Sequence, residues 1–359
     1  MTTRTNTASW SDSARRWRVS VQRDGVRRAF YSSTPGRAGQ REANAKADAW
    51  LASGVTPSGA RVRDLYADFK RETSLTVGTS YKRQMDYFGD KWILPAIGPK
   101  KISALCDQDV QHVLDAAAAA GLSRKTIQGI NAMMSKFFKY CRRRKLTSYR
   151  PDEVQIPSSA RLKGKRVLQP ADLVRLFNTD TYLYYGRRVP EPYIHAWRFQ
   201  VLTGLRPGEL RGLRRSDIHG RRIDITRSIN DYGETTRGKN ENAARSIYLS
   251  DMAYRELKAQ LSEYPDMDTV FGIPTPQVYG KHFKRFCEDN GLQYVSPYEL
   301  RHTFVSVVKR LPAGEIQPLV GHSADMDTFG VYGHALAGDE ITLAQNINAL
   351  FQQLLSPAK

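Results

Sequence analysis

The stretch from Ser296 to Tyr332 reads SPYELRHTFVSVVKRLPAGEIQPLVGHSADMDTFGVY. It presents an arginine (Arg301), a histidine (His322) and a tyrosine (Tyr332) in that order, each beside a short helix or turn signal. The chain contains 18 tyrosines, so a tyrosine taken alone is more often structural than reactive. Its place ten residues after His322 is what makes Tyr332 a candidate for chemistry.

Two upstream motifs extend this set. The sequence TGLRPGEL (203–210) supplies Arg206, which precedes Arg301 by 95 residues. The sequence TRGKNENAARSIYL (236–249) supplies Lys239 and ends as an alternating strand. Two arginines, a lysine, a histidine and a tyrosine suffice to attack a phosphodiester without a metal ion.

The physical reason is charge. A phosphodiester is anionic and gains further charge in its transition state, and arginine is always protonated and donates two parallel hydrogen bonds to phosphate oxygens. Such fixed donors typically contribute roughly 3–4 kcal/mol each to a transition state. Free tyrosine has a pKa near ~10, so it attacks well only where a cationic site favours its anion.

The order and context of these motifs resemble the tyrosine recombinase (phage integrase) family over nearly the full chain. The resemblance implies that Arg206 and Arg301 clamp the phosphate and that Tyr332 is the nucleophile. It also implies that His322 bonds the phosphate or helps to take the tyrosine proton, and that Lys239 protonates the leaving 5′-oxygen. Within the chain, Arg237 is the nearest competitor of Lys239, and the spacing to the following strand favours Lys239.

One position departs from the family pattern. The family usually has histidine three residues before the second arginine, where this chain has Tyr298. Tyrosine donates a hydrogen bond to phosphate but carries no positive charge, and we count Tyr298 as the sixth catalytic position. His302 is interpreted as a packing residue, and the remaining histidines are interpreted as ordinary: His112, His195, His219, His282 and His334.

Composition sets wider bounds. A chain of 359 residues is expected to form two or three domains, and a hydrophobic fraction of 40% is enough to build their cores. Lysine and arginine number 55 against 36 acidic residues, giving a net charge of +19. This surplus favours a polyanionic partner such as DNA, although a basic protein without a specific partner has the same composition.

The cysteines and the apolar segments indicate where the protein works. The three cysteines are widely spaced and form no metal-ligand pair, as is typical of a reduced cytoplasmic protein. We find no signal peptide, no membrane-spanning stretch, no nucleotide-binding glycine loop and no metal cluster. We therefore expect no metal and no cofactor, and the resemblance adds a cytoplasmic place of action on DNA in a bacterial or phage-infected cell.

Residues 1–56 are predicted to form a small basic module. Residues 17–21 and 26–31 alternate around an Asp24-Gly25 turn and predict a hairpin, and residues 39–52 predict a helix. The segment contains nine arginines and one lysine against four acidic residues. The resemblance implies an arm-type DNA-binding module of three strands and a helix, although no third strand is obvious. The arginines we assign to DNA are Arg16, Arg18, Arg27 and Arg28.

Residues 60–150 are predicted to be helical and, by the resemblance, to bind the core DNA site. Helices are expected from Val62, around residues 80–88, through Val110 with a cap at Ser103 or Asp107, and over 122–141. A turn is expected over 93–105. At the start of the last helix, backbone amides and positive charge would meet a phosphate. The residues assigned to this contact are Ser123, Arg124, Lys125 and Thr126.

A basic linker is expected from Arg142 to Arg166, followed by a catalytic domain over 166–359. In it we predict a helix over 171–177 and strands at 223–226 and 246–249 that flank a hairpin carrying Lys239. The final segment, 341–355, has one apolar helical face. That face either packs on its own domain or, as the resemblance implies, docks on a neighbouring protomer.

The resulting fold prediction is a multidomain, mainly α-helical protein with small β-sheets and a mixed α+β catalytic domain. The resemblance implies a site-specific recombinase of a mobile element, which acts through a 3′-phosphotyrosyl intermediate and a Holliday junction without ATP. Its partners would be double-stranded DNA with core and arm sites, further copies in a tetramer, and an accessory DNA-bending or excision factor. The alternatives are a type IB topoisomerase-like enzyme and a catalytically silent DNA-binding paralogue.

Overall fold

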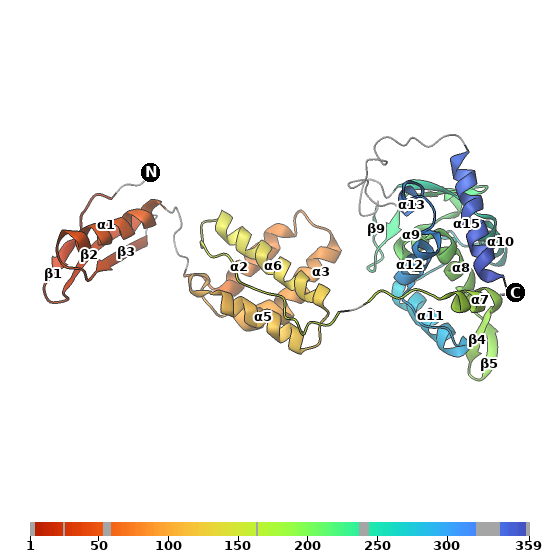
Figure 1. Cartoon of the computed structure of the whole chain (residues 1–359), viewed down its shortest axis with the longest axis horizontal. Coiled ribbons are helices and arrows are strands. Elements are labelled where there is room, and N and C mark those ends of the chain that lie inside the picture. The colour runs from red at the N-terminus through yellow and green to blue at the C-terminus, as the bar shows by residue number, and fades with distance from the viewer. Residues whose placement is uncertain are drawn as a thin grey trace. The chain divides into compact units, whose positions relative to one another are not determined.

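The computed structural model describes residues 4–23, 26–52, 59–162, 164–236, 244–320 and 338–356. The chain divides into two compact units, residues 1–163 and residues 164–359. Helices dominate, and the strands of the described ranges form small antiparallel sheets, which confirms the predicted fold class (Figure 1). Among the described helices, none is long and apolar enough to cross a membrane.

The N-terminal segment folds as a three-stranded sheet with one helix. The strands β1 (Ser9–Ser11), β2 (Arg16–Arg23) and β3 (Val26–Ser32) lie in that order in the sheet. The predicted hairpin is therefore confirmed, while its turn residues lie outside the described ranges. The third strand, which the sequence did not reveal, is β1: it has only three residues and is defined by pairing, with Trp10 opposite Trp17.

Helix α1 (Gly36–Ala52) covers one face of this sheet. Ala43 and Ala47 have no exposed surface, and they form a small hydrophobic cluster with Val19 and Val21 of β2. The helix predicted over 39–52 is therefore confirmed, and it begins three residues earlier. Since strand side chains alternate, the opposite face of the sheet is left for polar and charged side chains.

The rest of the first unit is helical, and its apolar faces form a separate hydrophobic cluster. Its elements are α2 (Val62–Thr73), α3 (Thr79–Phe88), a π-helical turn (Gly89–Ile93), α4 (Leu94–Ile97), a 3₁₀ turn (Ile102–Ala104), α5 (Asp107–Ala119) and α6 (Arg124–Arg143). Tyr66, Phe137 and Phe138 are fully buried at its centre. The helices predicted from Val62, around 80–88, through Val110 and over 122–141 are thus present as α2, α3, α5 and α6.

Two local predictions in this region were wrong. The segment 93–105 is not a plain turn, because it contains α4 and the 3₁₀ turn. The cap of α5 is Cys106 rather than Ser103 or Asp107: the Cys106 amide donates to the Asp109 carboxylate at 3.3 Å. A carboxylate at the third helical position satisfies that amide, so the helix begins one residue after the cysteine.

The predicted linker is largely part of the helical cluster. Tyr149, Val154 and Ile156 pack against that cluster, and the Tyr149 hydroxyl donates to the Asp107 carboxylate at 2.7 Å. Ala160 is buried in it. Apolar residues between the basic ones explain the difference, since they bury themselves against the helices while the charges stay solvated.

The second unit contains one large core. Its elements are α7 (Pro170–Asn178), β4 (Thr181–Tyr184), β5 (Arg187–Pro190), α8 (Ile194–Thr203), α9 (Pro207–Gly212), a 3₁₀ turn (Arg215–Asp217), β6 (Ile218–His219), β7 (Arg222–Ile225), β8 (Ser228–Ile229), β9 (Thr235–Thr236), β10 (Arg245–Tyr248), α10 (Asp251–Glu263), α11 (Pro276–Asn290), α12 (Pro297–Val308), α13 (Ala313–Val320) and α15 (Asp339–Leu355).

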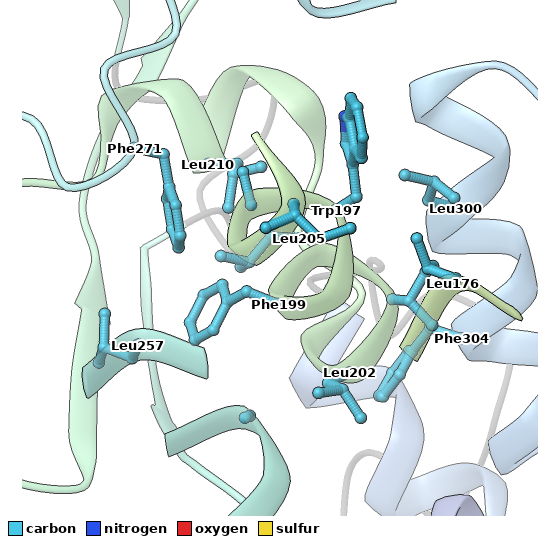
Figure 2. Close-up of a cluster of buried hydrophobic side chains, with 14 of the residues drawn as sticks. Leu176, Trp197, Phe199, Leu202, Leu205, Leu210, Leu257, Phe271, Leu300 and Phe304 are labelled. Carbon is cyan, nitrogen blue, oxygen red and sulfur yellow. The ribbon is translucent and has the colours of Figure 1, made fainter. Parts of the chain in front are cut away.

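Helix α8 lies at the centre of this core. Trp197, Phe199 and Leu202 leave it in different directions, toward side chains such as Leu300 and Phe304 of α12 (Figure 2). Nine of its ten residues are buried, including the polar Arg198 and Gln200, and α8 packs against both α10 and α12. The helix after it therefore starts from a rigid base.

The predicted strands pair as expected, with Ile247 of β10 opposite Ile223 of β7. The polar stretch between them is more structured than predicted, because β8 and β9 form an additional two-stranded sheet. Lys239 lies outside the described residues.

Helix α15 packs on its own unit. Ile347 and Phe351 are buried in the core, and the helix contacts α7, α10, α12 and β10. Of the two alternatives for this face, the structure shows packing on its own domain, and docking on a neighbouring protomer stays a prediction. The face is satisfied in cis because α7 and α10 already offer it an apolar surface.

Candidate active site

Arg206 stands at the junction of two helices. Helix α8 ends at Gly204, whose φ of +67° and close approach to the Phe304 ring leave no room for a side chain. Two residues later Arg206 caps α9, with Pro207 as the first helical residue. The Arg206 amide donates to Glu209 Oε2 at 2.9 Å, and its guanidinium Nη1 donates to Oε1 at 2.7 Å.

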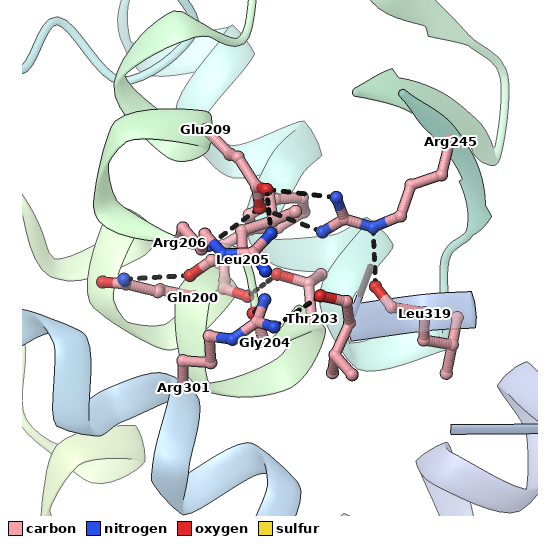
Figure 3. A network of polar contacts seen from close by, with 11 residues as sticks. Gln200, Thr203, Gly204, Leu205, Arg206, Glu209, Arg245, Arg301 and Leu319 are labelled. Carbon is pink, nitrogen blue, oxygen red and sulfur yellow. Dashed lines mark hydrogen bonds and ion pairs between the residues drawn. The ribbon is translucent and has the colours of Figure 1, made fainter. Parts of the chain in front are cut away.

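Arg301 comes from the second turn of α12 and is only 2% exposed. Its Nη1 donates to the Gly204 carbonyl at 2.8 Å, and its Nη2 donates to the Val320 carbonyl. Arg301 thereby ties the end of α8 to the end of α13. The two predicted arginines, 95 residues apart in sequence, thus meet at the turn between α8 and α9 (Figure 3).

The electrostatics of this pair are unfavourable in the absence of an anion. Burial, together with the nearby positive charge of Arg206, lowers the pKa of Arg301 to about 10. Arg301 still carries its proton at neutral pH. A phosphate placed between them would relieve this repulsion, and a transition state with more negative charge would relieve it more.

Two members of the site, Arg245 and Glu209, were not predicted from the sequence. Arg245, the first residue of β10, donates Nη1 to Glu209 Oε1 at 3.1 Å and Nη2 to Oε2 at 2.9 Å. Burial raises the pKa of Glu209, but hydrogen bonds from Arg245 and Arg206 outweigh it, so the net pKa is lowered and the carboxylate is ionised. The available signals were the glutamate three residues after Arg206 and an arginine opening an otherwise apolar strand.

The structure places three of the six predicted catalytic residues. Arg206 and Arg301 come together, and Tyr298 lies one helical turn before Arg301 with 48% of its surface exposed. The ring of Tyr298 contacts His302 at 5.2 Å between centroids, consistent with a packing role for His302. The other three predicted residues lie outside the described ranges: Lys239, His322 and Tyr332.

The end of α13, which precedes the segment that contains His322, is held at the site. The Leu319 carbonyl accepts from Arg245 Nε at 2.7 Å, and the next carbonyl, that of Val320, accepts from Arg301. His322 follows Val320 by two residues. The chain leading to His322 therefore starts from a point that two arginines fix.

The four arginines assigned to DNA in the N-terminal module are all exposed, but they do not share one face. Strand alternation places Arg16 and Arg18 with Arg27 on the face away from α1, and the Arg16 guanidinium stacks on the Tyr31 ring at 4.3 Å. Arg28 pairs opposite Val21 and lies on the α1 side. The predicted basic surface is therefore a stripe of three arginines.

The start of α6 is also less open than expected. The Ser123 hydroxyl accepts from the Thr126 amide at 3.2 Å, and the Arg124 amide donates to the Arg161 carbonyl at 2.9 Å. Two of the first three helical amides are thus used within the chain. Any phosphate contact here would come mainly from side chains, of which that of Lys125 is exposed.

Comparisons with known proteins point to one family. Residues 166–338 match the family model described as "Phage integrase family". The chain is 24% identical to an integrase of Streptomyces ambofaciens, over 77% of each chain. It is 26% identical to tyrosine recombinase XerC of Alcanivorax borkumensis, over 66% of this chain and 78% of the other.

Solved structures show the same fold. The Tn1549 transposon integrase in complex with transposon right end DNA matches with a TM-score of 0.64 and 19% identity, over 83% of this chain and all of the other. A lambda integrase tetramer bound to a Holliday junction matches with a TM-score of 0.57 and 14% identity, over 92% and 97% of the two chains. Residues 166–338, which carry the paired arginines, therefore form a domain of the phage integrase family of tyrosine recombinases.

Proposed function

We propose that this protein is a site-specific DNA recombinase that cuts and rejoins DNA strands for a mobile element. The observation that carries the proposal is the arginine pair: Arg206 and Arg301 converge, one of them fully buried, with Glu209 and two backbone carbonyls fixing their positions. Preorganised cations of this kind stabilise a charged transition state without rearranging when it forms.

Each step uses a residue of this chain. Tyr332 attacks the scissile phosphorus and forms a 3′-phosphotyrosyl bond, while the bond to the 5′-oxygen breaks. Lys239 gives that oxygen a proton, and His322 bonds the phosphate or takes the tyrosine proton. Tyr298 donates a hydrogen bond to the phosphate from the exposed side of α12. A 5′-hydroxyl from the second DNA then attacks the phosphotyrosine and forms a Holliday junction, so no ATP is consumed.

The partners follow from the same proposal. The helical region and the N-terminal module would hold core and arm sites of double-stranded DNA, and the domains would be 1–56, 60–150 and 166–359. Four copies would act on two DNA sites in the cytoplasm. An accessory DNA-bending or excision factor would set the direction of recombination. The net charge of +19 and the relatives solved on DNA support this assembly.

The test is a DNA duplex with a nick beside the cleavage site, which traps the covalent intermediate because the short fragment diffuses away. The wild-type protein should form a covalent complex, and Tyr332→Phe should bind equally but form none. A persistent adduct in Tyr332→Phe would mean that another residue attacks. Absence of any adduct with the wild type would favour the silent DNA-binding alternative, and relaxation without strand exchange would favour the topoisomerase alternative.

The assignment of Lys239 needs its own experiment. Lys239→Ala should cleave slowly, and a 5′-phosphorothiolate at the cleaved bond should restore the rate because a thiolate leaves without a proton. Arg237→Ala is the matched control, since it removes a neighbouring cation. Rescue of Arg237→Ala instead would transfer the proton-donating role to Arg237.

A further inference from the structure

Arg245 has a place in the active site that its position in the sequence does not reveal. It opens β10, is held in the sheet opposite Ile225 of β7, and only 8% of its side chain is exposed. Both Nη atoms reach the two oxygens of Glu209, and Nε reaches the Leu319 carbonyl at 2.7 Å. A guanidinium is the side chain that can make this forked contact and a third bond in one plane.

These contacts connect Arg245 with both phosphate-clamping arginines. Glu209 is the carboxylate that also fixes the guanidinium of Arg206. Leu319 is the neighbour of Val320, whose carbonyl holds Arg301. Arg245 therefore touches the support of one arginine and the helix end that supports the other (Figure 3).

We propose that Arg245 is a positioning residue for strand cleavage: it locks Glu209 and the end of α13, and so sets the separation of Arg206 and Arg301 around the scissile phosphate. The inference rests on the recombinase function proposed above. We assign Arg245 no contact with the reacting atoms, because Nε and both Nη atoms bond Leu319 and Glu209.

The charge balance of the cluster supports this role. If Arg245 were absent, Arg206 would be the remaining partner of Glu209, through its amide and Nη1, and the carboxylate would hold that arginine in a tighter internal ion pair. Arg245 shares the carboxylate and leaves the cluster with three positive charges against one negative charge among these four residues. The surplus stays available to a phosphate.

The first experiment compares single-turnover cleavage of the nicked DNA with DNA affinity. Arg245→Ala should slow cleavage at saturating DNA by about 100-fold, the usual cost of displacing a catalytic group by about 1 Å, with little change in affinity. Arg245→Lys keeps the charge but cannot make the forked contact, so its rate should fall between those of the alanine variant and the wild type. An unchanged rate in Arg245→Ala would overturn the proposal.

Arg198→Ala is the matched control. Arg198 is buried in the same unit and donates Nε to the Leu176 carbonyl at 2.9 Å and Nη2 to the Asp180 carboxylate. Within the described part of the chain, none of its side-chain hydrogen bonds or ion pairs reaches the arginine pair. Both variants are assayed below their unfolding temperatures, as judged by circular dichroism. Cleavage by Arg198→Ala should equal that of the wild type, and an equal loss in both variants would mean that Arg245 is merely structural.

A double-mutant cycle tests the route of action. If Arg245 works through the arginine pair, its loss should cost about 100-fold in the wild type but less than about 10-fold in an Arg206→Ala background. The same cost in both backgrounds would overturn the proposal. If Arg245→Ala does not fold, the cycle is run with Arg245→Lys, for which the same non-additivity is expected.

The two proposals fail in different ways. If the wild type forms no covalent complex, the recombinase function fails before Arg245 is considered. If the wild type forms the complex, Tyr332→Phe does not, and Arg245→Ala matches the wild type, then only the role of Arg245 is refuted.

Discussion

Arginine serves two regions of this molecule in opposite environments. In the N-terminal sheet, Arg16, Arg18 and Arg27 stand exposed on one face. In the second unit, Arg245 and Arg301 are buried and engaged by carbonyls and a carboxylate. The exposed arginines are able to adjust to any phosphate, and salt screens them. The buried ones are fixed before DNA arrives.

Burial changes what the charge of an arginine contributes to binding and to catalysis. An exposed arginine near DNA contributes to binding through counterion release, which affects substrate and transition state alike. A buried arginine is costly to desolvate, as the lowered pKa of Arg301 shows, and the cost is recovered when negative charge appears beside it. Binding and catalysis should therefore respond differently to loss of the two kinds of arginine.

The largest effect is expected from Arg301→Ala. Removing this preorganised donor should slow covalent complex formation by about 1000-fold, or about 4 kcal/mol, while DNA affinity changes little. The measurement is single-turnover cleavage of nicked DNA beside an equilibrium DNA titration. Cleavage within a few-fold of wild type would break the comparison, because the buried arginine would then be only structural.

The next effect concerns helix α15. Phe351→Ala should lower the free energy of unfolding by about 3 kcal/mol, because it empties a fully buried site in the catalytic core. Ile341→Ala, on the same helix but 42% exposed, should change it by less than about 0.5 kcal/mol. Urea unfolding measures both. A stable Phe351→Ala protein that fails to assemble on DNA would instead favour docking of α15 on a neighbour.

A second buried glutamate, Glu191, shows how much the arginine partners of Glu209 matter for its ionisation. Burial raises the pKa of Glu191 to about 7, more than the Tyr193 amide and the charge of Arg285 lower it, whereas forked arginine contacts lower the pKa of Glu209. In the unfolded chain Glu191 loses its proton at a lower pH than in the folded protein. The stability that the protonated Glu191 contributes is therefore fully present below about pH 4.5 and is lost as the pH rises to about 7.

Glu191→Gln should therefore gain stability relative to the wild type over that interval, on the order of 2 kcal/mol by pH 7. His282, whose pKa is lowered by burial, lies 3.3 Å from the Glu191 carboxylate, so the comparison is made in a His282→Gln background that removes its coupled titration. Urea unfolding at several pH values measures the difference. A difference that is constant with pH would refute the raised pKa.

The smallest effect is expected in the N-terminal sheet. Arg27→Ala should reduce the slope of log affinity against log salt by about 1 on DNA with arm sequences, because one phosphate contact is lost. Arg28→Ala, on the α1 side, should leave that slope unchanged. Cleavage of a short core site should be normal in both. Equal slopes for the two variants would refute the three-arginine stripe.

Local patterns in the sequence were enough for much of the fold. The helical faces that contain Tyr66 and Phe137, and the pairing of β7 with β10, follow from periods of 3.6 and 2 that any window of the chain reveals. The strand β1 was not predicted because three residues are too few to show an alternating pattern. The sequence left the cis packing of α15 as one of two alternatives, because an apolar face does not state which surface covers it.

The sequence by itself determined the chemistry: Arg206 and Arg301 in recognisable motifs, a basic N-terminal sheet, and the expectation of a phosphodiester as substrate. Only the tertiary structure decided how the arginines are held. Gly204, Glu209, Arg245 and the carbonyls at the end of α13 meet around them from four separate segments. Such contacts depend on packing across the whole core, which no local sequence pattern records. Burial then fixes the side chains and strengthens the electrostatic interactions between their charges.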